Sequence, residues 1–353
     1  MDQSKIKKIL YFGIYKPTAP RDKIYLDGLK KLGIEIIECV DNTSGFKKFI
    51  NLYKKHSKLK GQYDLFWIGY SSGILSVLAR FISQKKIVYN ALNSMYESYV
   101  LDRERPAKGS LGSFVIWFGD FLAFHFAHIS LVESEEQKKF ISNFFLVNPK
   151  RLFVVYTGAD EDVFYPDPNI KKNDTFTVCF RGMFLPATGV EYVIEAARIL
   201  KDEDINFLVI GWGEPIEEWV KNKIKEYDLT KLTLITVFLS VDDLRQKMLS
   251  SDVILGQFCA NERMDRTIQH KTFEAMALGM PYITRDSRSN REILTDRENC
   301  LFVKVEDPQD IADKILELKN NKDLREKIAS NAYKLYQEKL TQKVLVNKII
   351  KCL

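Results

Sequence analysis

Residues 268–292, IQHKTFEAMALGMPYITRDSRSNRE, contain the pattern that decides the fold. A helix with a small apolar face is expected to end at Gly279 and Pro281, because glycine tolerates left-handed backbone and proline cannot continue a helix. Residues 282–284 then predict a short buried strand, and a second helix is expected from about Ser289. A helix that feeds a parallel strand in this way is typical of doubly wound α/β proteins, whose ligands bind at the carboxyl ends of the strands.

The rest of the chain predicts two such units. Its 353 residues exceed what one hydrophobic core usually organises. Residues 8–14, KILYFGI, open a first strand–helix–strand unit, and residues 176–180 open a second. The segment 157–174 between them is rich in proline, glycine and acidic residues, which marks a domain boundary.

Composition restricts the class of function. The five cysteines are scattered without a CxxC pair, which argues for reduced thiols in a cytoplasmic setting and against a zinc site. Neither a signal peptide nor an apolar run of about 18 residues is present, so no membrane-spanning segment is expected. A net charge of +6 fits anionic substrates or a membrane surface, and its dispersal among acidic residues makes nucleic acid an improbable partner.

The run K-x-x-E-A-M-A-x-G-x-P at residues 271–281 resembles the sugar-nucleotide site of glycosyltransferase family 4, a retaining group within the glycosyl transferases group 1. The resemblance implies the GT-B fold, α/β with two Rossmann-like doubly wound domains facing a deep cleft. An acceptor-binding domain would span 1–160 and a sugar-nucleotide-binding domain 161–335. A terminal helix in 336–353 would pack back on the first domain.

The resemblance also assigns roles in the second domain. Glu274 would hold the ribose hydroxyls, since a carboxylate accepts two hydrogen bonds from a vicinal diol. Glycines in matching places would let backbone N–H groups approach a diphosphate; they are Gly182, Gly211 and Gly213. The family's usual arginine and lysine of this loop are replaced by Met183 and Thr188, and Arg181 could compensate for them.

The family's second glutamate, eight residues before the first, is replaced by Arg266. This departure removes a residue that reads the donor sugar and adds a cation where a diphosphate should lie. We hypothesise that Lys271 and Arg266 bind the diphosphate together with the backbone of Gly182. The front-face mechanism attributed to the family requires no dedicated nucleophile.

Several residues of the first domain match a family subgroup that uses this region for the acceptor. Gly13 and Arg21 stand in matching places, and Arg21 either reaches a ligand or is a solvated surface arginine. Asp102 and Arg103 belong to a matching loop, with a surface ion pair of little energetic value as the alternative. Asn90 stands where relatives often carry aspartate or histidine.

Two apolar segments raise the question of a membrane surface. Residues 45–60, GFKKFINLYKKHSKLK, predict a basic amphipathic helix that could lie on an anionic bilayer. An ordinary surface helix, with its apolar side on the sheet and its lysines in water, is slightly favoured. Residues 113–128 are apolar and aromatic, and a buried or interdomain helix is expected there.

The sequence therefore predicts a retaining hexosyltransferase. It would move a sugar from a nucleotide-diphosphate sugar to a saccharide or lipid-linked saccharide, without a bound cofactor or metal. We expect a cytoplasmic protein, with peripheral attachment to the inner face of the membrane if the acceptor is lipid-linked. The alternative is a catalytically impaired scaffold or sugar-nucleotide-binding protein, which the departures at Arg266, Met183, Thr188 and Asn90 support. A GT-B epimerase or phosphorylase is a third candidate, and the pyridoxal lysine of a phosphorylase cannot be placed.

Overall fold

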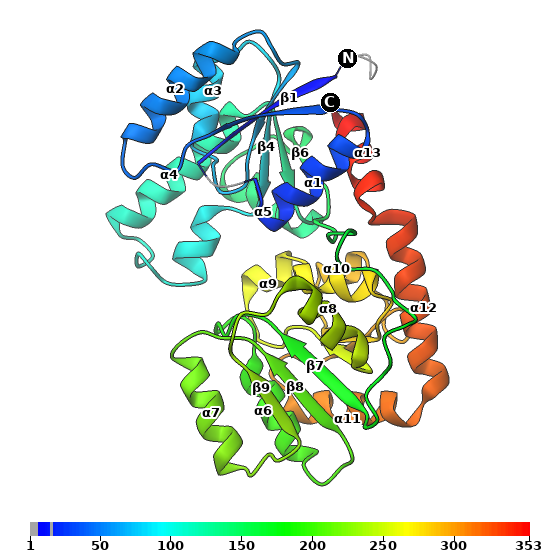
Figure 1. Ribbon diagram of the computed structural model, residues 1–353. Helices are drawn as coiled ribbons and strands as arrows, with labels where there is room; N and C mark the ends of the chain where they lie inside the picture. The colour runs from blue at the N-terminus through cyan, green and yellow to red at the C-terminus, as the bar shows by residue number, and fades with distance from the viewer. Residues whose placement is uncertain (1–5, 15–16) are drawn as a thin grey trace. The chain divides into compact units, whose positions relative to one another are not determined.

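The computed structural model describes residues 6–14 and 17–353 (Figure 1). The chain divides into two compact units. Unit 1 comprises Met1–Asp160 and Thr341–Leu353, and unit 2 comprises Glu161–Leu340. The chain therefore leaves unit 1, forms unit 2 and returns to unit 1 for its last helix.

Unit 1 is built on a six-stranded parallel sheet with the order β2-β1-β3-β4-β5-β6. Its strands are β1 (Lys8–Gly13), β2 (Glu35–Val40), β3 (Leu65–Ile68), β4 (Ile87–Leu92), β5 (Ile129–Val132) and β6 (Leu152–Val154). Its α-helices are α1 (Pro20–Lys31), α2 (Lys47–Leu59), α3 (Leu75–Ile82), α4 (Leu111–Phe126), α5 (Glu135–Phe144) and α13 (Gln342–Cys352). A π-helical turn, η2 (Glu97–Leu101), and a 3-10 turn, η3 (Pro149–Arg151), complete it.

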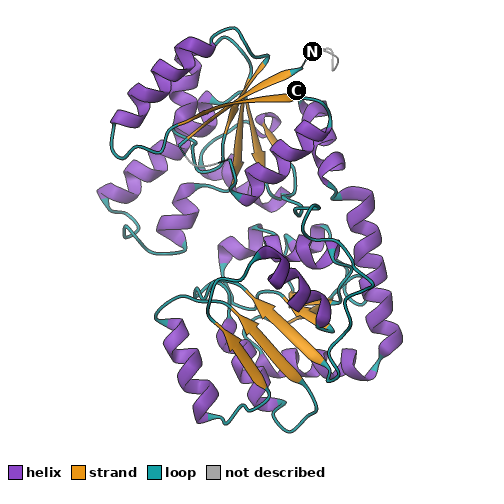
Figure 2. Cartoon of the chain, in the orientation of Figure 1, coloured by secondary structure: helices purple, strands orange, loops and turns teal. Residues whose placement is uncertain are grey.

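The helices of unit 1 cover the two faces of this sheet unequally (Figure 2). Residues of α1 and α13, among them Tyr25 and Ile349, pack together on one face. Residues of α2, α3, α4 and α5, among them Leu52, Ala79 and Phe124, pack on the other. The central strands are apolar on both sides because helices cover both faces.

Unit 2 repeats this architecture with a parallel sheet of six strands in the order β12-β11-β10-β7-β8-β9. Its strands are β7 (Thr177–Arg181), β8 (Asn206–Ile210), β9 (Leu232–Ile235), β10 (Val253–Leu255), β11 (Tyr282–Arg285) and β12 (Leu301–Val303). Its helices are α6 (Val190–Ile199), α7 (Ile216–Glu226), α8 (Val241–Ser250), α9 (Glu262–Arg266), α10 (His270–Ala277), α11 (Pro308–Asn320) and α12 (Lys322–Lys339). The predicted fold class, two doubly wound α/β units, is confirmed.

One expectation from the sequence is wrong, and another is met only in part. The helix expected from Ser289 is only a 3-10 turn, η4 (Asn290–Glu292), because polar side chains bond locally there: Ser287 Oγ accepts from the Asn290 amide, and the Asn290 side chain donates to the Arg285 carbonyl. For residues 113–128, where a buried or interdomain helix was expected, burial is met only in part: α4 packs one side on the sheet and exposes large apolar side chains on the other.

Near the end of the chain, α12 continues to Lys339, so residues 336–339 belong to unit 2 and the last helix begins at Gln342. Across residues 6–14 and 17–353, no helix combines the length and apolar character needed to cross a membrane.

Candidate functional site

The carboxyl ends of β7 and β10, which are adjacent strands of unit 2, bring a buried lysine against a glycine loop. Gly182 directly follows β7, and a Cβ built on it would lie 3.3 Å from the Nζ of Lys271. The same Nζ donates a hydrogen bond of 3.2 Å to the carbonyl of Gly256, which directly follows β10. An ammonium group is thus held at the edge of the sheet where doubly wound proteins bind ligands.

The surroundings of Lys271 disfavour its own charge. Only 6% of the residue is exposed, and burial, followed by the neighbouring Arg181, lowers the pKa of Lys271 to about 7. Its Nζ lies 4.3 Å from the ring centroid of Phe180, a weak compensation for lost hydration. An anion beside this ammonium would favour the charged form, so the position suits a phosphate.

Glu274, one helical turn after His270 on α10, is almost wholly buried and lies between the nitrogen atoms of two side chains. Its carboxylate forms an ion pair with Arg181, the last residue of β7. The other nitrogen is Nδ1 of His270, at 3.1 Å. Burial, with a smaller effect of Arg181, lowers the pKa of His270 to about 3, so its imidazole is neutral at neutral pH and Arg181 is the charged partner of Glu274. Burial lowers the pKa of Arg181 to about 10, which still leaves it charged at neutral pH.

The remaining glycines of the predicted site hold two loops against each other. A Cβ on Gly211 would lie 2.0 Å from the carbonyl oxygen of Gly182, so only glycine fits there. Gly213 has φ +138°, and its Cβ would lie 2.8 Å from the carbonyl oxygen of Phe184. The amide of Phe184 donates 2.8 Å to the carbonyl of Trp212, which ties the loop after β7 to the loop after β8.

Arg266 lies on a different helix from Lys271. It is the last residue of α9, is 7% exposed, and has its NH1 3.7 Å from a carboxylate oxygen of Glu262. Of the two residues that replace the family's loop cations, Met183 is half-exposed and Thr188 is buried. The Thr188 hydroxyl donates 2.7 Å to the carbonyl of Leu185 and so shapes the loop.

In unit 1, the structure buries Arg21 in a polar network, so the interpretation of a solvated surface arginine is wrong. Its guanidinium donates to the Asn90 side chain at 2.8 Å and to the Val155 carbonyl at 3.0 Å. It also donates to the Thr157 hydroxyl and forms a buried ion pair with Glu133. These bonds join α1 to the ends of β4, β5 and β6, which explains why a full cation is tolerated at 3% exposure.

The other predicted residues of unit 1 lie around this network or beyond it. Asn90 is completely buried, and its side chain also donates 2.7 Å to Asp22. Gly13 is the last residue of β1. Asp102 follows the π-helical turn η2, and exposed Arg103 lies 5.1 Å from the ring centroid of Tyr99. The structure thus joins Arg21 to Asn90 and Arg181 to Glu274.

Sequence reasoning missed two exposed aromatic residues at the ligand edge of unit 2. Trp212 follows β8 and is 37% exposed, and Phe238 follows the adjacent strand β9 and is 81% exposed. Their rings meet edge to face with centroids 5.9 Å apart. The signal in the sequence was an aromatic residue within three positions of the end of each of two strands, where core packing does not require one.

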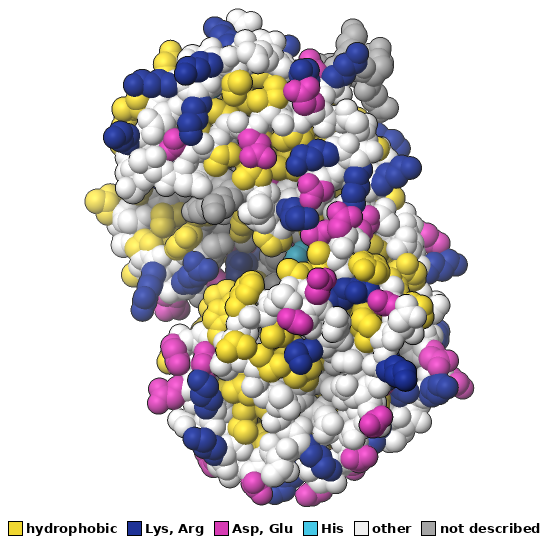
Figure 3. All heavy atoms as spheres, in the orientation of Figure 1, with side chains coloured by type: hydrophobic (Ala, Val, Ile, Leu, Met, Phe, Trp, Pro, Cys, Tyr) yellow, Lys and Arg dark blue, Asp and Glu magenta, His cyan; other side chains and the backbone are white. Residues whose placement is uncertain are grey.

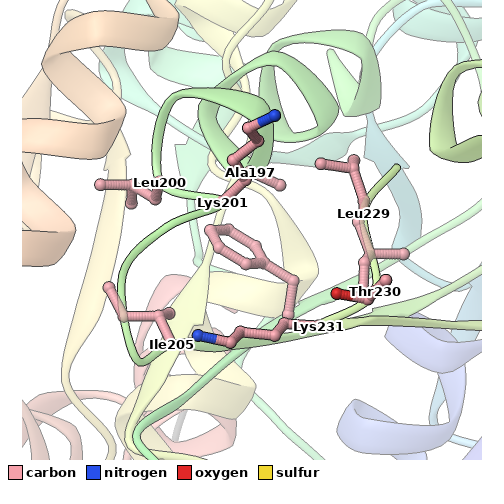
Figure 4. A pocket seen from close by; sticks show the side chains of 9 residues that line it. Ala197, Leu200, Lys201, Ile205, Leu229, Thr230 and Lys231 are labelled. Atoms are coloured by element: carbon pink, nitrogen blue, oxygen red, sulfur yellow. The ribbon is translucent and has the colours of Figure 1, made fainter. Parts of the chain in front are cut away.

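A small hollow of unit 2 lies away from this edge (Figure 4). Ile205, Phe207 and Leu232 line it at the amino ends of β8 and β9, opposite the ligand-binding end. Within the described ranges, no group of three or more His, Cys, Asp or Glu side chains is placed to hold a metal ion. The carboxyl ends of β7, β8 and β10 therefore remain the candidate site.

Comparison with known proteins agrees with this geometry. Residues 164–335 match the family described as glycosyl transferases group 1. The chain is 29% identical over 194 residues to an uncharacterized glycosyltransferase of Methanocaldococcus jannaschii, covering 55% of this chain and 51% of that protein. The chain thus spans about half the length of this relative.

Two further proteins resemble nearly the whole chain. An N,N'-diacetylbacillosaminyl-diphospho-undecaprenol alpha-1,3-N-acetylgalactosaminyltransferase of Campylobacter jejuni is 22% identical over 333 residues, covering 89% of this chain and 84% of that protein. The crystal structure of HepE from Anabaena, in complex with UDP and glucose, has a TM-score of 0.73 at 16% identity over 98% of both chains. At 16% identity, the similarity to HepE shows a shared fold only.

The two sheets and the glycine loops after β7 and β8 define an α/β protein of the GT-B class. The similarity to the group 1 glycosyltransferases extends over residues 164–335, about half of the chain. The resemblance to the group 1 glycosyltransferases that residues 271–281 predict is confirmed, and membership of glycosyltransferase family 4 stays a prediction.

Proposed function

We propose that this protein is a retaining glycosyltransferase that moves a hexosyl group from a nucleoside-diphosphate sugar to a saccharide or lipid-linked saccharide. The observation that carries the proposal is the placement of Lys271 against Gly182, with Arg181 and Glu274 beside them at the end of β7. A cation that could bind phosphate, a glycine backbone that a ligand could approach and a carboxylate that could bind a diol therefore lie close together at the carboxyl end of β7.

In the proposed reaction, the bond between the anomeric carbon and the diphosphate breaks, the acceptor oxygen bonds to the same face of that carbon, and the proton of the acceptor hydroxyl passes to the departing diphosphate. Negative charge then develops on the departing nucleoside diphosphate. Lys271, the Gly182 backbone and Arg266 would stabilise this charge, which is the main requirement of such a reaction. No bound cofactor or metal is proposed.

Glu274 would accept hydrogen bonds from the two ribose hydroxyls. Because Arg181 already pairs with Glu274, a bound nucleotide would compete for this carboxylate. We propose that Arg181 then turns to the diphosphate, where it serves in place of the cations that Met183 and Thr188 do not supply.

The relatives suggest which substrates to test first. HepE was crystallised with UDP and glucose, which makes uridine diphosphate sugars the first candidate donors. The name of the Campylobacter jejuni relative specifies a diphospho-undecaprenol acceptor, which makes a lipid-linked saccharide the first candidate acceptor.

A thermal-shift experiment with uridine, guanosine and adenosine diphosphate sugars tests the donor site. One nucleotide should raise the unfolding temperature, because a ligand that binds only the native state stabilises it by mass action. Glu274→Ala should abolish the shift, and Glu218→Ala on the exposed side of α7 should preserve it. If the ligand raises the unfolding temperature of both variants equally, Glu274 is not part of the donor site.

A sugar-nucleotide-binding scaffold without transfer activity is the second candidate. The replacement of two loop cations and the existing Arg181–Glu274 pair favour it. Donor binding without hydrolysis or transfer to any saccharide would support the scaffold, whereas turnover that Lys271→Ala abolishes would support the transferase.

A further inference from the structure

The exposed apolar side chains of unit 1 lie on one side of its sheet. Across the described part of the chain, α1 and α13 carry no large exposed hydrophobic side chain. The opposite face carries nine on or beside its first three helices: Phe46, Ile50, Tyr53, Ile74, Phe81, Leu111, Phe114, Val115 and Phe118. Apolar patches of this kind mark surfaces that contact another molecule.

Helix α4 presents an apolar outer side. Leu111, Phe114, Val115 and Phe118 are 80%, 57%, 62% and 45% exposed, and their spacing places them along one stripe of the helix. The only charged residue of α4, Asp120, is buried on the inner side. The outer side of α4 therefore carries no charged side chain of this helix that would favour contact with water.

Helix α2 carries a second exposed stripe. Phe46, Ile50 and Tyr53 are 74%, 46% and 54% exposed, while Leu52 and His56 pack toward the sheet. The expectation that the apolar side of this helix lies on the sheet, with only lysines facing water, is therefore wrong in part. The helix is apolar on two sides.

Basic side chains lie beside both stripes. Helix α2 contains no acidic residue, and its Lys47, Lys54 and Lys58 form no ion pair among the described residues. Exposed Arg105 and Lys108 precede the first residue of α4. Figure 3 shows dark-blue and yellow side chains gathered over the part of unit 1 where α2 and α4 lie in Figure 1.

We propose that the outer sides of α2 and α4 form a contact surface for an anionic lipid bilayer. The apolar stripes would enter the boundary between headgroups and acyl chains, and the lysines would pair with lipid phosphates. The positive charge favours an anionic bilayer over a second copy of this chain, because two such surfaces would repel each other. This inference goes beyond the proposed function, since binding to lipid requires neither donor nor acceptor.

Flotation of the full chain with lipid vesicles tests the proposal. Wild type should float with vesicles of mixed phosphatidylcholine and phosphatidylglycerol, and much less with phosphatidylcholine alone. Leu111→Ser/Val115→Ser on α4 and Phe46→Ser/Ile50→Ser on α2 should each lower the apparent affinity by about tenfold, because each removes two inserting side chains. These side chains are exposed, so the variants should unfold at the wild-type temperature.

Matched controls lie in unit 2. Phe238→Ser removes an exposed phenylalanine, and Lys201→Glu/Lys225→Glu reverses two exposed charges; both should bind vesicles as wild type does. Lys54→Glu/Lys58→Glu on α2 should abolish the preference for anionic lipid. The proposal is overturned if wild type does not float, if the α2 and α4 variants float equally well, or if light scattering shows a wild-type dimer that these variants dissociate.

Discussion

A lysine whose pKa is near 7 is charged in only about half of the molecules at neutral pH, and Lys271 is such a lysine. A bound diphosphate would favour its charged form and raise its pKa. Above pH 7, binding must therefore take up a proton, and the affinity should fall by up to about tenfold per pH unit until the pKa of the complex is reached.

Calorimetric titration of the preferred nucleoside diphosphate between pH 6 and pH 9 measures this dependence. Lys271→Ala should bind weakly with little of this pH dependence, and Lys271→Arg, which stays charged, should also lose it. If the alanine variant keeps the wild-type decline, another group is responsible for it.

Individual site residues could be predicted where a backbone requirement or a motif specified them. Gly182 and Gly211 were predicted as glycines that let the backbone approach a diphosphate, and that role stays a prediction. The structure adds a packing reason, because it places the Cβ position of Gly211 against the Gly182 carbonyl. The ion pair of Arg181 with Glu274 and the buried network of Arg21 could not be predicted. Each depends on strands far apart in the sequence becoming neighbours in a sheet, which local patterns do not specify.

At the scale of elements, α4 combines an apolar body with one buried acid. Burial is the largest cause that raises the pKa of Asp120 to about 7, although its carboxylate accepts a 2.7 Å hydrogen bond from the Tyr96 amide. From about pH 4 to pH 7 the native state therefore keeps a proton that the unfolded chain has lost. Asp120 thus lowers the free energy of unfolding as the pH rises through this range, and its effect levels off above pH 7.

Asp120→Asn should remove this contribution. The urea midpoint of the variant should rise relative to wild type between pH 5 and pH 8, because the asparagine amide carries no charge to desolvate. Its side-chain oxygen can still accept from Tyr96, which preserves the loop before η2. If the urea midpoints of the variant and of wild type differ by the same amount at pH 5 and at pH 8, the pKa of Asp120 is not raised.

The best-predicted elements are the strands in which consecutive residues are all buried. The apolar runs of β1 and β7 identify buried parallel strands, because both of their faces are covered. Helices α2 and α4 were predicted as helices. For α2 an exposed apolar side was one of two alternatives, and for α4 a buried or interdomain position was expected. Periodicity shows which residues share a side of a helix, and it does not show which side the sheet will cover.

At the scale of the whole molecule, α13 belongs to unit 1 although it follows unit 2 in sequence. Leu345, Val346 and Ile349 are buried against α1, and a Cβ on Gly28 would lie 2.7 Å from a methyl carbon of Val346. Leu345→Ala should therefore lower the stability of unit 1 by about 2–4 kcal/mol, the usual cost of truncating a buried leucine.

Hydrogen exchange provides the measurement for this substitution. Protection of amides in β1 and β3 should decrease, while protection in β7 and β8 should be preserved. Asn347→Ala, on the exposed side of the same helix, is the control and should leave both sets unchanged. An equal loss of protection in both units would show that they do not open independently.

The return of the chain to unit 1 has a consequence for its synthesis on the ribosome. Strands β1 to β6 emerge first, but the helix that covers Ile24, Tyr25 and Leu29 emerges only after all of unit 2 has been made. The nascent chain therefore carries an uncovered apolar face during most of translation, and such a face is prone to aggregation and is a target for chaperones. The unit that is started first is the last to be completed.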